Sequence, residues 1–242
     1  MIKKLCGLFL VISILVGIIL GCKNIKQNEQ KPSMYMAIGD SLLVYSSYGD
    51  MVYEGLKDNH VNSYSDIVKR SSLDTESLLR FIEVKATIIK EKENQNIIDL
   101  IKKSKYITIQ IGQADLNNNL RFNSVEEKFY YNVNVIERAM AQVQENIYNI
   151  VNEIKQINKN VKVYVIGYYF PYPSIDENEK VIGLEIYGEL NESLRLGAYD
   201  SGAKFIEISD LSDIKYLPNK NNTILNEEGI EQLSKLILSE IE

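Results

Sequence analysis

Segments that favour β-strands alternate along this chain with segments that favour helices, and this alternation limits the fold more than any other feature. Short apolar or β-branched runs bounded by glycine are typical of buried parallel strands. Five segments have this character: Met34–Ile38, His60–Val68, Tyr106–Ile111, Val161–Gly167 and Lys204–Ile208. Because alternating strands and helices form a mostly parallel sheet covered on both faces, we expect residues 34–242 to form one three-layer α/β/α domain with about five strands.

Helical patterns occupy most of the intervals between these strands. The predicted helices include Met51–Leu56, Asp74–Phe81, Asn94–Lys103, Val181–Tyr199 and Asn226–Ile241. Asp74 and Asn226 stand where an N-cap is expected, because their short polar side chains can accept a hydrogen bond from the first turn. Ser124-Val-Glu-Glu127 matches the capping-box pattern, so we place the start of the longest helix there and its end near Asn158.

A tight turn that contains a serine directly follows the first predicted strand. Gly39 lets the backbone bend sharply because it has no Cβ, and Asp40 and Ser41 come next. Parallel α/β sheets bind their ligands at the carboxyl ends of the strands, so the Ser41 hydroxyl is a candidate for catalysis or binding. The three residues alone are a weak signal, since an ordinary strand-to-helix turn uses the same residue types.

The first 21 residues have the pattern of a secretory signal. Lys3 and Lys4 precede the apolar stretch Leu5–Leu20, and Gly21-Cys22 follows it. This ending resembles a bacterial lipoprotein signal, which implies cleavage after residue 21 and lipid attachment at Cys22. The domain would then be held at the extracytoplasmic face of the cell membrane. A retained membrane helix is the alternative, because the stretch is near the lower limit of ~17 residues for a span.

Charge and cysteine content restrict the rest of the chain. The net charge of −6 becomes −8 when Lys3 and Lys4 leave with the signal. An acidic domain without a long basic run argues against nucleic-acid binding. Cys6 also leaves and Cys22 carries the lipid, so no thiol remains for a disulfide or a metal site. Residues 22–33 are polar and end near a proline, which is typical of a flexible tether.

Four motifs resemble those of the SGNH or GDSL hydrolases, which are serine esterases and lipases. Gly39-Asp40-Ser41-Leu42 follows the first strand as in that family, and Gly112-Gln113-Ala114-Asp115 corresponds to its Gly-x-Asn-Asp motif. Ile166–Pro171 resembles a later loop of the family, and Asn226–Gly229 resembles the end of its last motif. The resemblance extends from Met34 to the C-terminus. It implies a flavodoxin-like (SGNH hydrolase) fold with Ser41 as the nucleophile.

The departures from the family's motifs concern the groups that assist the serine. The resemblance puts the catalytic Asp and His at positions that are Asn221 and Ile224 in this chain. An asparagine that donates to the oxyanion is replaced by Ala114, and a glycine with the same role falls at Ser72. Of the family's four groups, only Ser41 clearly remains.

His60 is the single histidine of the chain, so any serine–histidine pair has to use it. The helix after Ser41 carries the chain toward the opposite edge of the sheet, and eight helical residues already cover more than ~10 Å. A general base must lie within ~3 Å of the hydroxyl, so we interpret His60 as an exposed loop residue. A lysine or a carboxylate, such as that of Glu227 or Glu228, is the remaining alternative for a base.

Other residues near these motifs are candidates for binding. We expect Asp40, Gly112 and Asp115 to contact a ligand, although for Asp115 we favour the alternative role of capping the loop after the third strand. Tyrosines near the two loops either line a pocket mouth or pack at its rim: Tyr45, Tyr48, Tyr53, Tyr168, Tyr169 and Tyr172. The chain lacks dinucleotide and phosphate-loop motifs and has one histidine, so we expect no cofactor and no metal.

Two functions of different classes are compatible with these observations. In the first, the chain is a membrane-anchored SGNH-fold lipoprotein without Ser-His-Asp catalysis, which binds a small acyl or glycan ligand or an envelope protein. In the second, it is a carboxylic-ester hydrolase (a lipase, esterase or deacetylase) that uses Ser41 with a non-standard base. Loss of the histidine costs ~10⁶ in the turnover of a serine protease, and loss of an oxyanion donor costs ~10²–10³. These losses favour the first function.

Overall fold

The structure, a computed structural model, describes residues 33–67, 73–90, 93–220 and 222–241. The predicted signal over residues 1–21, Cys22, nearly all of the predicted tether, Ser72 and Asn221 lie outside the described residues. Pro32–Glu242 forms one structural unit. Within its described part, no helix combines the length and the apolar character that crossing a membrane requires.

Five parallel strands form the central sheet. They are β1 (Met34–Gly39), β2 (Ser63–Ile67), β5 (Ser104–Gln110), β8 (Lys162–Ile166) and β9 (Lys204–Ile206). The strands lie in the order β2-β1-β5-β8-β9, and every neighbouring pair is parallel. Numbered along the chain, this is the flavodoxin-like order 2-1-3-4-5. The predicted fold class is therefore confirmed.

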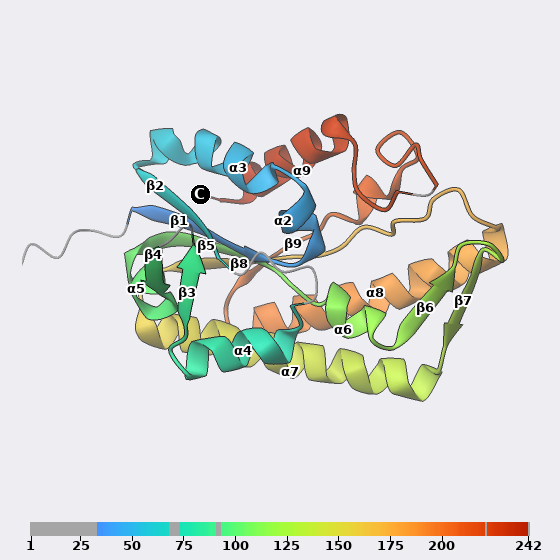
Figure 1. The fold of residues 1–242 in the computed structure, drawn as a ribbon, viewed down its shortest axis with the longest axis horizontal. Coiled ribbons are helices and arrows are strands. Elements are labelled where there is room, and N and C mark those ends of the chain that lie inside the picture. The colour runs from blue at the N-terminus through green and yellow to red at the C-terminus, as the bar shows by residue number, and fades with distance from the viewer. Residues whose placement is uncertain (1–32, 68–72, 91–92, 221, 242) are drawn as a thin grey trace, which may run out of the picture. The chain divides into compact units, whose positions relative to one another are not determined.

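Helices cover both faces of the sheet (Figure 1). One face carries α2 (Ser41–Tyr45), α3 (Tyr48–Leu56) and α9 (Glu227–Glu240). The other carries α4 (Thr75–Glu83), α5 (Ile97–Lys103), α7 (Val133–Ile157) and α8 (Glu177–Asp200). The side chains of β1 alternate between the two cores: Tyr35 and Ala37 pack in the first, and Met36 and Ile38 in the second. This alternation follows from the two-residue period of a strand.

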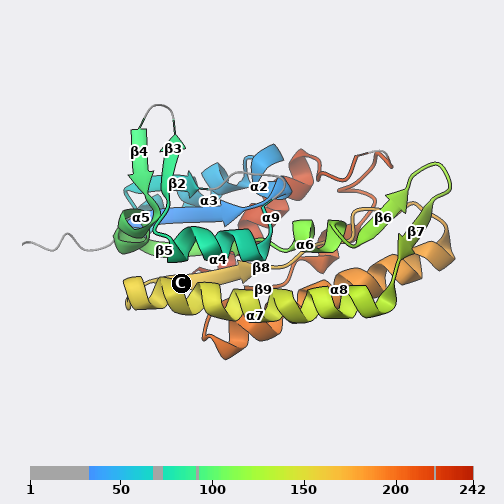
Figure 2. The same ribbon diagram turned by 60° about the horizontal axis from the view of Figure 1, so that its bottom comes forward.

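Two hairpins that the sequence patterns did not predict lie at different ends of the domain (Figure 2). They pair β3 (Thr87–Lys90) with β4 (Glu93–Asn96), and β6 (Leu120–Asn123) with β7 (Lys128–Tyr131). The predicted helix start at Ser124 is wrong, because residues 124–127 form the turn of the second hairpin and α7 begins at Val133. Phe129 is buried, with its ring centroid 4.8 Å from that of Phe122. Packing of this aromatic strand outweighs the local capping signal.

The two predicted N-caps are confirmed. The Asp74 side chain accepts a hydrogen bond from Ser77 N at 2.8 Å, and the Asn226 side chain accepts one from Gly229 N at 2.9 Å. Asn226 Nδ2 also donates to the Lys215 carbonyl oxygen at 2.8 Å. Asn226 thereby holds the loop that precedes α9, and this loop forms part of the site described next.

Candidate functional site

The candidate site lies where β1 and β5 end side by side. Asp40 N donates to the Gln110 carbonyl oxygen at 3.0 Å, so the turn after β1 lies against the turn after β5. The sheet continues from this pair in opposite directions, to β2 beyond β1 and to β8 beyond β5. Flavodoxin-like sheets bind ligands at such a switch point. Ser41 begins α2 at this edge, and Gln113 begins α6 (Gln113–Asn117).

The two turns meet through the side chains of Ser41 and Gln113. Ser41 Oγ donates a hydrogen bond to Gln113 Oε1 at 2.6 Å. The Gln113 side chain also lies near the hydroxyl of Tyr187 on α8 and lowers the pKa of Tyr187 in part, against the larger rise caused by burial. An amide oxygen accepts hydrogen bonds but is not an ionisable group. Gln113 is therefore a hydrogen-bond partner of Ser41 and not a general base.

A pocket of about 90 Å³ opens beside Ser41. Its lining comes from the two turns, the loop after β8 and the loop before α9: Ser41, Leu42, Tyr45, Gln113, Tyr168, Tyr169, Thr223 and Ile224. The Tyr169 hydroxyl donates to the Thr223 carbonyl oxygen at 2.8 Å, which ties the last loop to the pocket wall. Among these described lining residues, none carries an imidazole or a carboxylate.

Asp40 lies fully buried in the turn that carries Ser41. Its Oδ2 accepts hydrogen bonds from the Tyr168 hydroxyl and from Gln113 N, the latter at 3.2 Å. Burial raises the pKa of Asp40 to about 7, although these hydrogen bonds favour the carboxylate. Asp40 does not line the pocket, so in this structure it positions two residues that do. Its own contact with a ligand stays a prediction.

The turn after β5 depends on Gly112. Its φ of 137° lies in the region that glycine adopts at no steric cost, and an added Cβ would come within 3.2 Å of Leu190 Cδ1. Gly112 is buried and is absent from the pocket lining. Ala114, two residues later, is buried in the first turn of α6, and its methyl group offers no hydrogen-bond donor.

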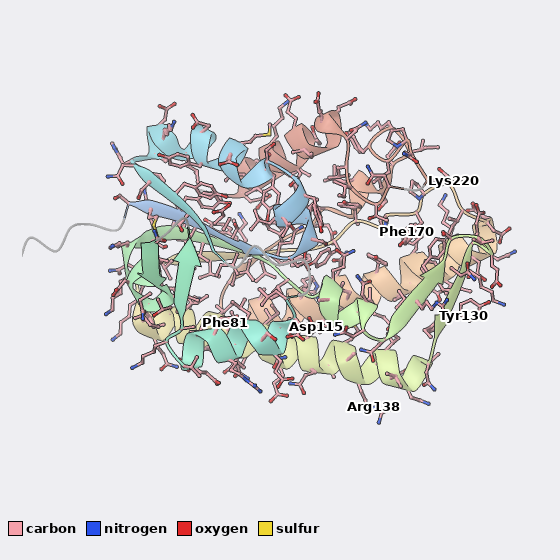
Figure 3. All side chains as sticks on the ribbon, in the orientation of Figure 1. Phe81, Asp115, Tyr130, Arg138, Phe170 and Lys220 are labelled. Atoms are coloured by element: carbon pink, nitrogen blue, oxygen red, sulfur yellow. The ribbon has the colours of Figure 1, made fainter. Side chains whose placement is uncertain are left out.

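Asp115 lies beside the helices α4 and α7 (Figure 3). Its carboxylate accepts hydrogen bonds from Thr75 N at 3.0 Å and from Thr75 Oγ1 at 2.7 Å. Asn146 Nδ2 of α7 donates to Thr75 Oγ1 at 2.8 Å. Burial raises the pKa of Asp115. The carboxylate thus joins α6 to α4 and α7, and any contact of Asp115 with a ligand stays a prediction.

Residues 35–236 match the family described as GDSL-like lipase/acylhydrolase. The chain belongs to this family. One similar solved structure is a lipase from a goat rumen metagenome, with 20% identity and a TM-score of 0.64; the match covers 85% of this chain and 96% of that chain. Another is an extracellular lipase from Streptomyces rimosus, with 15% identity and a TM-score of 0.55; the match covers 86% of this chain and 99% of that chain. A third is Axe2, an acetylxylan esterase from Geobacillus stearothermophilus, with 12% identity and a TM-score of 0.55; the match covers 87% of this chain and 94% of that chain. At these identities the structures share the fold. Among curated proteins, none matches this chain.

The loop before α9 contributes Ile224 to the pocket of this GDSL-family protein. Ile224 lines the pocket together with Ser41, at the position that the sequence comparison above gives to the family's histidine. His60 is distant: Asn62 N donates to the Ser33 carbonyl oxygen at 2.9 Å, which puts the segment beside the start of β1. Ser41 follows the other end of this six-residue strand, and six strand residues span ~20 Å. His60 is exposed, as predicted.

The predicted tyrosines fall into two groups. Tyr45, Tyr168 and Tyr169 line the pocket. The others pack elsewhere: Tyr48 is buried, Tyr53 stacks on Tyr64, and Tyr172 packs against Phe122. Sequence reasoning gave no role to Gln113 or Tyr187, since the first is an unspecified position of its motif and the second lies in a helix far along the chain. Among the described residues, no group of three His, Cys, Asp or Glu side chains is arranged to hold a metal ion.

Proposed function

We propose that this GDSL-family protein binds a small acyl-bearing ligand in the Ser41 pocket and does not hydrolyse it. The observation that carries the proposal is the hydrogen bond from Ser41 Oγ to Gln113 Oε1 at 2.6 Å. A serine nucleophile needs a neighbouring base to take its proton, and here the proton points to an amide. Ile224 lines the pocket where the family's histidine is expected.

At the position where the family's motif has an asparagine, the site also has no side chain that could stabilise an oxyanion. Ala114 has no donor, and such a donor contributes ~10²–10³ in rate. A pocket that has a serine at the switch point, but neither of these groups, is suited to recognition. The ligand would be a small acyl group or part of a glycan, or the pocket would receive a segment of an envelope protein.

We further propose that a lipid on Cys22 holds this domain at the extracytoplasmic face of the membrane. The support is the sequence pattern of residues 1–22, with its basic start, apolar stretch and terminal Gly21-Cys22. A diacylglyceryl cysteine supplies two acyl chains, enough for stable anchoring, whereas a single chain binds only marginally.

Activity-based labelling tests the absence of hydrolysis. The protein and its Ser41→Ala variant are treated with a fluorophosphonate probe and with a chromogenic acetyl ester. We expect neither fast labelling nor turnover above that of the variant. Turnover that disappears in Ser41→Ala would overturn the proposal and establish the alternative, an ester hydrolase with a base other than histidine.

A further inference from the structure

Asp40 holds two residues of the pocket wall without lining the pocket itself. Its Oδ2 accepts one hydrogen bond from the hydroxyl of Tyr168 and another from Gln113 N at 3.2 Å. Tyr168 lines the pocket from the loop after β8, and Gln113 lines it from the start of α6. Two sides of the pocket therefore depend on one oxygen of a fully buried residue.

The other oxygen of this carboxyl group, Oδ1, is the natural place for a proton. It is buried and has no hydrogen-bond partner within the described part of the chain. A proton that joins the group therefore binds Oδ1, and Oδ2 becomes a neutral carbonyl oxygen that still faces both donors. Hydrogen bonds to a charged acceptor are roughly twice as strong as those to a neutral one. Protonation of Asp40 thus weakens both hydrogen bonds together.

We propose that Asp40 is a proton switch for the Ser41 pocket: loss of its proton tightens the hydrogen bonds to Tyr168 and Gln113 and so fixes two sides of the pocket. Proton uptake loosens the same two sides. Burial raises the pKa of Asp40 to about 7, so the change falls near neutral pH. A ligand that contacts the fixed walls binds the ionised form more tightly and releases a proton on binding. The switch belongs to the pocket itself and does not depend on whether the ligand is bound or hydrolysed there.

Other titratable groups that interact with Asp40 come from three further parts of the fold and from α6. They are Tyr48 on α3, Tyr168 and Tyr169 on the loop after β8, Tyr187 on α8 and Asp115 on α6. Burial raises the pKa of each of these tyrosines above its ordinary value, so all four are neutral near pH 7. Burial also raises the pKa of Asp115, which follows Gln113 closely in α6. A test of the switch has to distinguish Asp40 from Asp115.

NMR on the full chain in detergent follows the switch from pH 5 to pH 9. The Gln113 amide proton reports one hydrogen bond, and a carbon-13 label at Tyr168 Cζ reports the other. We expect both signals to shift with a common midpoint near pH 7, and the Gln113 proton to move downfield as its hydrogen bond tightens. The Gly229 amide is the matched control and should not move, because its acceptor at 2.9 Å is the Asn226 side chain, which does not ionise.

Substitution of Asp40 assigns the titration to one carboxyl group. In Asp40→Asn, the Gln113 and Tyr168 signals should stay constant over this pH range, because an amide does not ionise. A titration of the Gln113 amide that persists in Asp40→Asn belongs to Asp115 and overturns the proposal. So does a Gln113 amide that does not titrate in the wild type.

A pair of tyrosine variants keeps the test decisive if Asp40→Asn does not fold. Tyr168→Phe removes a donor that favours the carboxylate, so the midpoint seen at Gln113 should rise by about one pH unit. Tyr169→Phe is the matched control, since this adjacent tyrosine also lines the pocket but donates to the Thr223 carbonyl oxygen at 2.8 Å. It should leave the midpoint where it is in the wild type. Equal midpoints in the two variants would overturn the proposal, whereas turnover that depends on Ser41 would overturn only the proposed function.

Discussion

Asp40 and Ser41 are adjacent in the chain but have opposite environments. The Ser41 side chain reaches the pocket, whereas Asp40 is fully buried between Tyr168 and the start of α6. A buried carboxylate is costly because the charged form loses its hydration, and the pKa of Asp40 is raised to about 7 for this reason. The hydrogen bonds that make Asp40 useful for positioning Tyr168 and Gln113 only partly offset that cost.

Asp40 therefore makes stability depend on pH. Its pKa is about 7 in the folded protein and about 4 in an unfolded chain, so the folded state binds more protons between these values. The contribution to the free energy of unfolding is fully present below about pH 4, falls as the pH rises to about 7, and is constant above. The size is on the order of 4 kcal/mol.

The Asp40→Asn variant checks this dependence by urea denaturation at pH 5 and pH 8. Asparagine keeps an acceptor for the Tyr168 hydroxyl but does not ionise, so the variant should gain stability relative to the wild type as the pH rises. An equal difference at both pH values would show that Asp40 does not titrate in this range.

The prediction that Ile224 stands in the place of the family's histidine can be tested by introducing a histidine at this position. Because Ile224 lines the pocket with Ser41, an imidazole at this position should approach the hydroxyl. We expect Ile224→His to raise the rate of fluorophosphonate labelling at pH 8, where histidine is neutral, by up to ~10²-fold, as for a serine–histidine pair without its aspartate.

Two controls accompany the histidine variant. Ile224→Asn introduces a polar group without a base and should not raise labelling. Adding Ser41→Ala to Ile224→His should remove labelling altogether. A histidine variant that reacts no faster than the wild type would mean that position 224 is not within reach of the serine.

At the scale of elements, Asp115 joins three helices. Through Thr75 it connects α6 to the first turn of α4, and Asn146 extends the network to α7. Thr75 is fully buried, so its N–H and hydroxyl find no water if the carboxylate is removed. This geometry assigns Asp115 a structural task whether or not a ligand also contacts it.

Replacement of Asp115 by alanine should therefore reduce stability. We expect Asp115→Ala to lower the free energy of unfolding by about 2 kcal/mol, the cost of leaving a buried donor unsatisfied, as measured by chemical denaturation. Asp99→Ala removes an exposed carboxylate from the first turn of α5 and should cost less than ~1 kcal/mol. Equal losses in the two variants would contradict the network.

At the scale of the whole molecule, the site and the predicted attachment point lie at opposite ends of β1. The described chain enters the domain at Ser33, next to the start of β1, and Ser41 follows the end of β1. If the domain is anchored by a lipid, the tether therefore joins it at the start of β1, and the pocket lies at the other end of this strand.

The anchoring itself is tested by fractionation. Cys22→Ser should release the protein from the membrane or leave it unprocessed, because the lipid can no longer be attached. Cys6→Ser lies within the apolar stretch of the signal and should leave the protein in the membrane fraction at its mature size. If Cys22→Ser behaves like Cys6→Ser, Cys22 is not lipidated, and a retained helix becomes the explanation.

The sequence by itself determined the sheet, its helical cover and the serine turn. Strand and cap signals such as Val161–Gly167, Asp74 and Asn226 are local, because backbone propensity and first-turn hydrogen bonds act within a few residues. Motif positions also predict that Ile224 stands in the place of the family's histidine, and this assignment stays a prediction. The hairpin at Ser124 was missed because Phe129 packs against Phe170 and Tyr172, which lie far along the chain, and this burial outweighs the local capping signal.

Only the tertiary structure decided what surrounds Ser41. The partner of the serine, Gln113, lies 72 positions along the chain, and Tyr187, whose hydroxyl interacts with Gln113, is further still. Neither pairing has a local signature, since both exist only after β1 and β5 align and α8 packs beneath them. The buried state of Asp40, and with it the raised pKa, depends on the same packing. Short-range preferences set the fold, and long-range packing set the chemistry of its pocket.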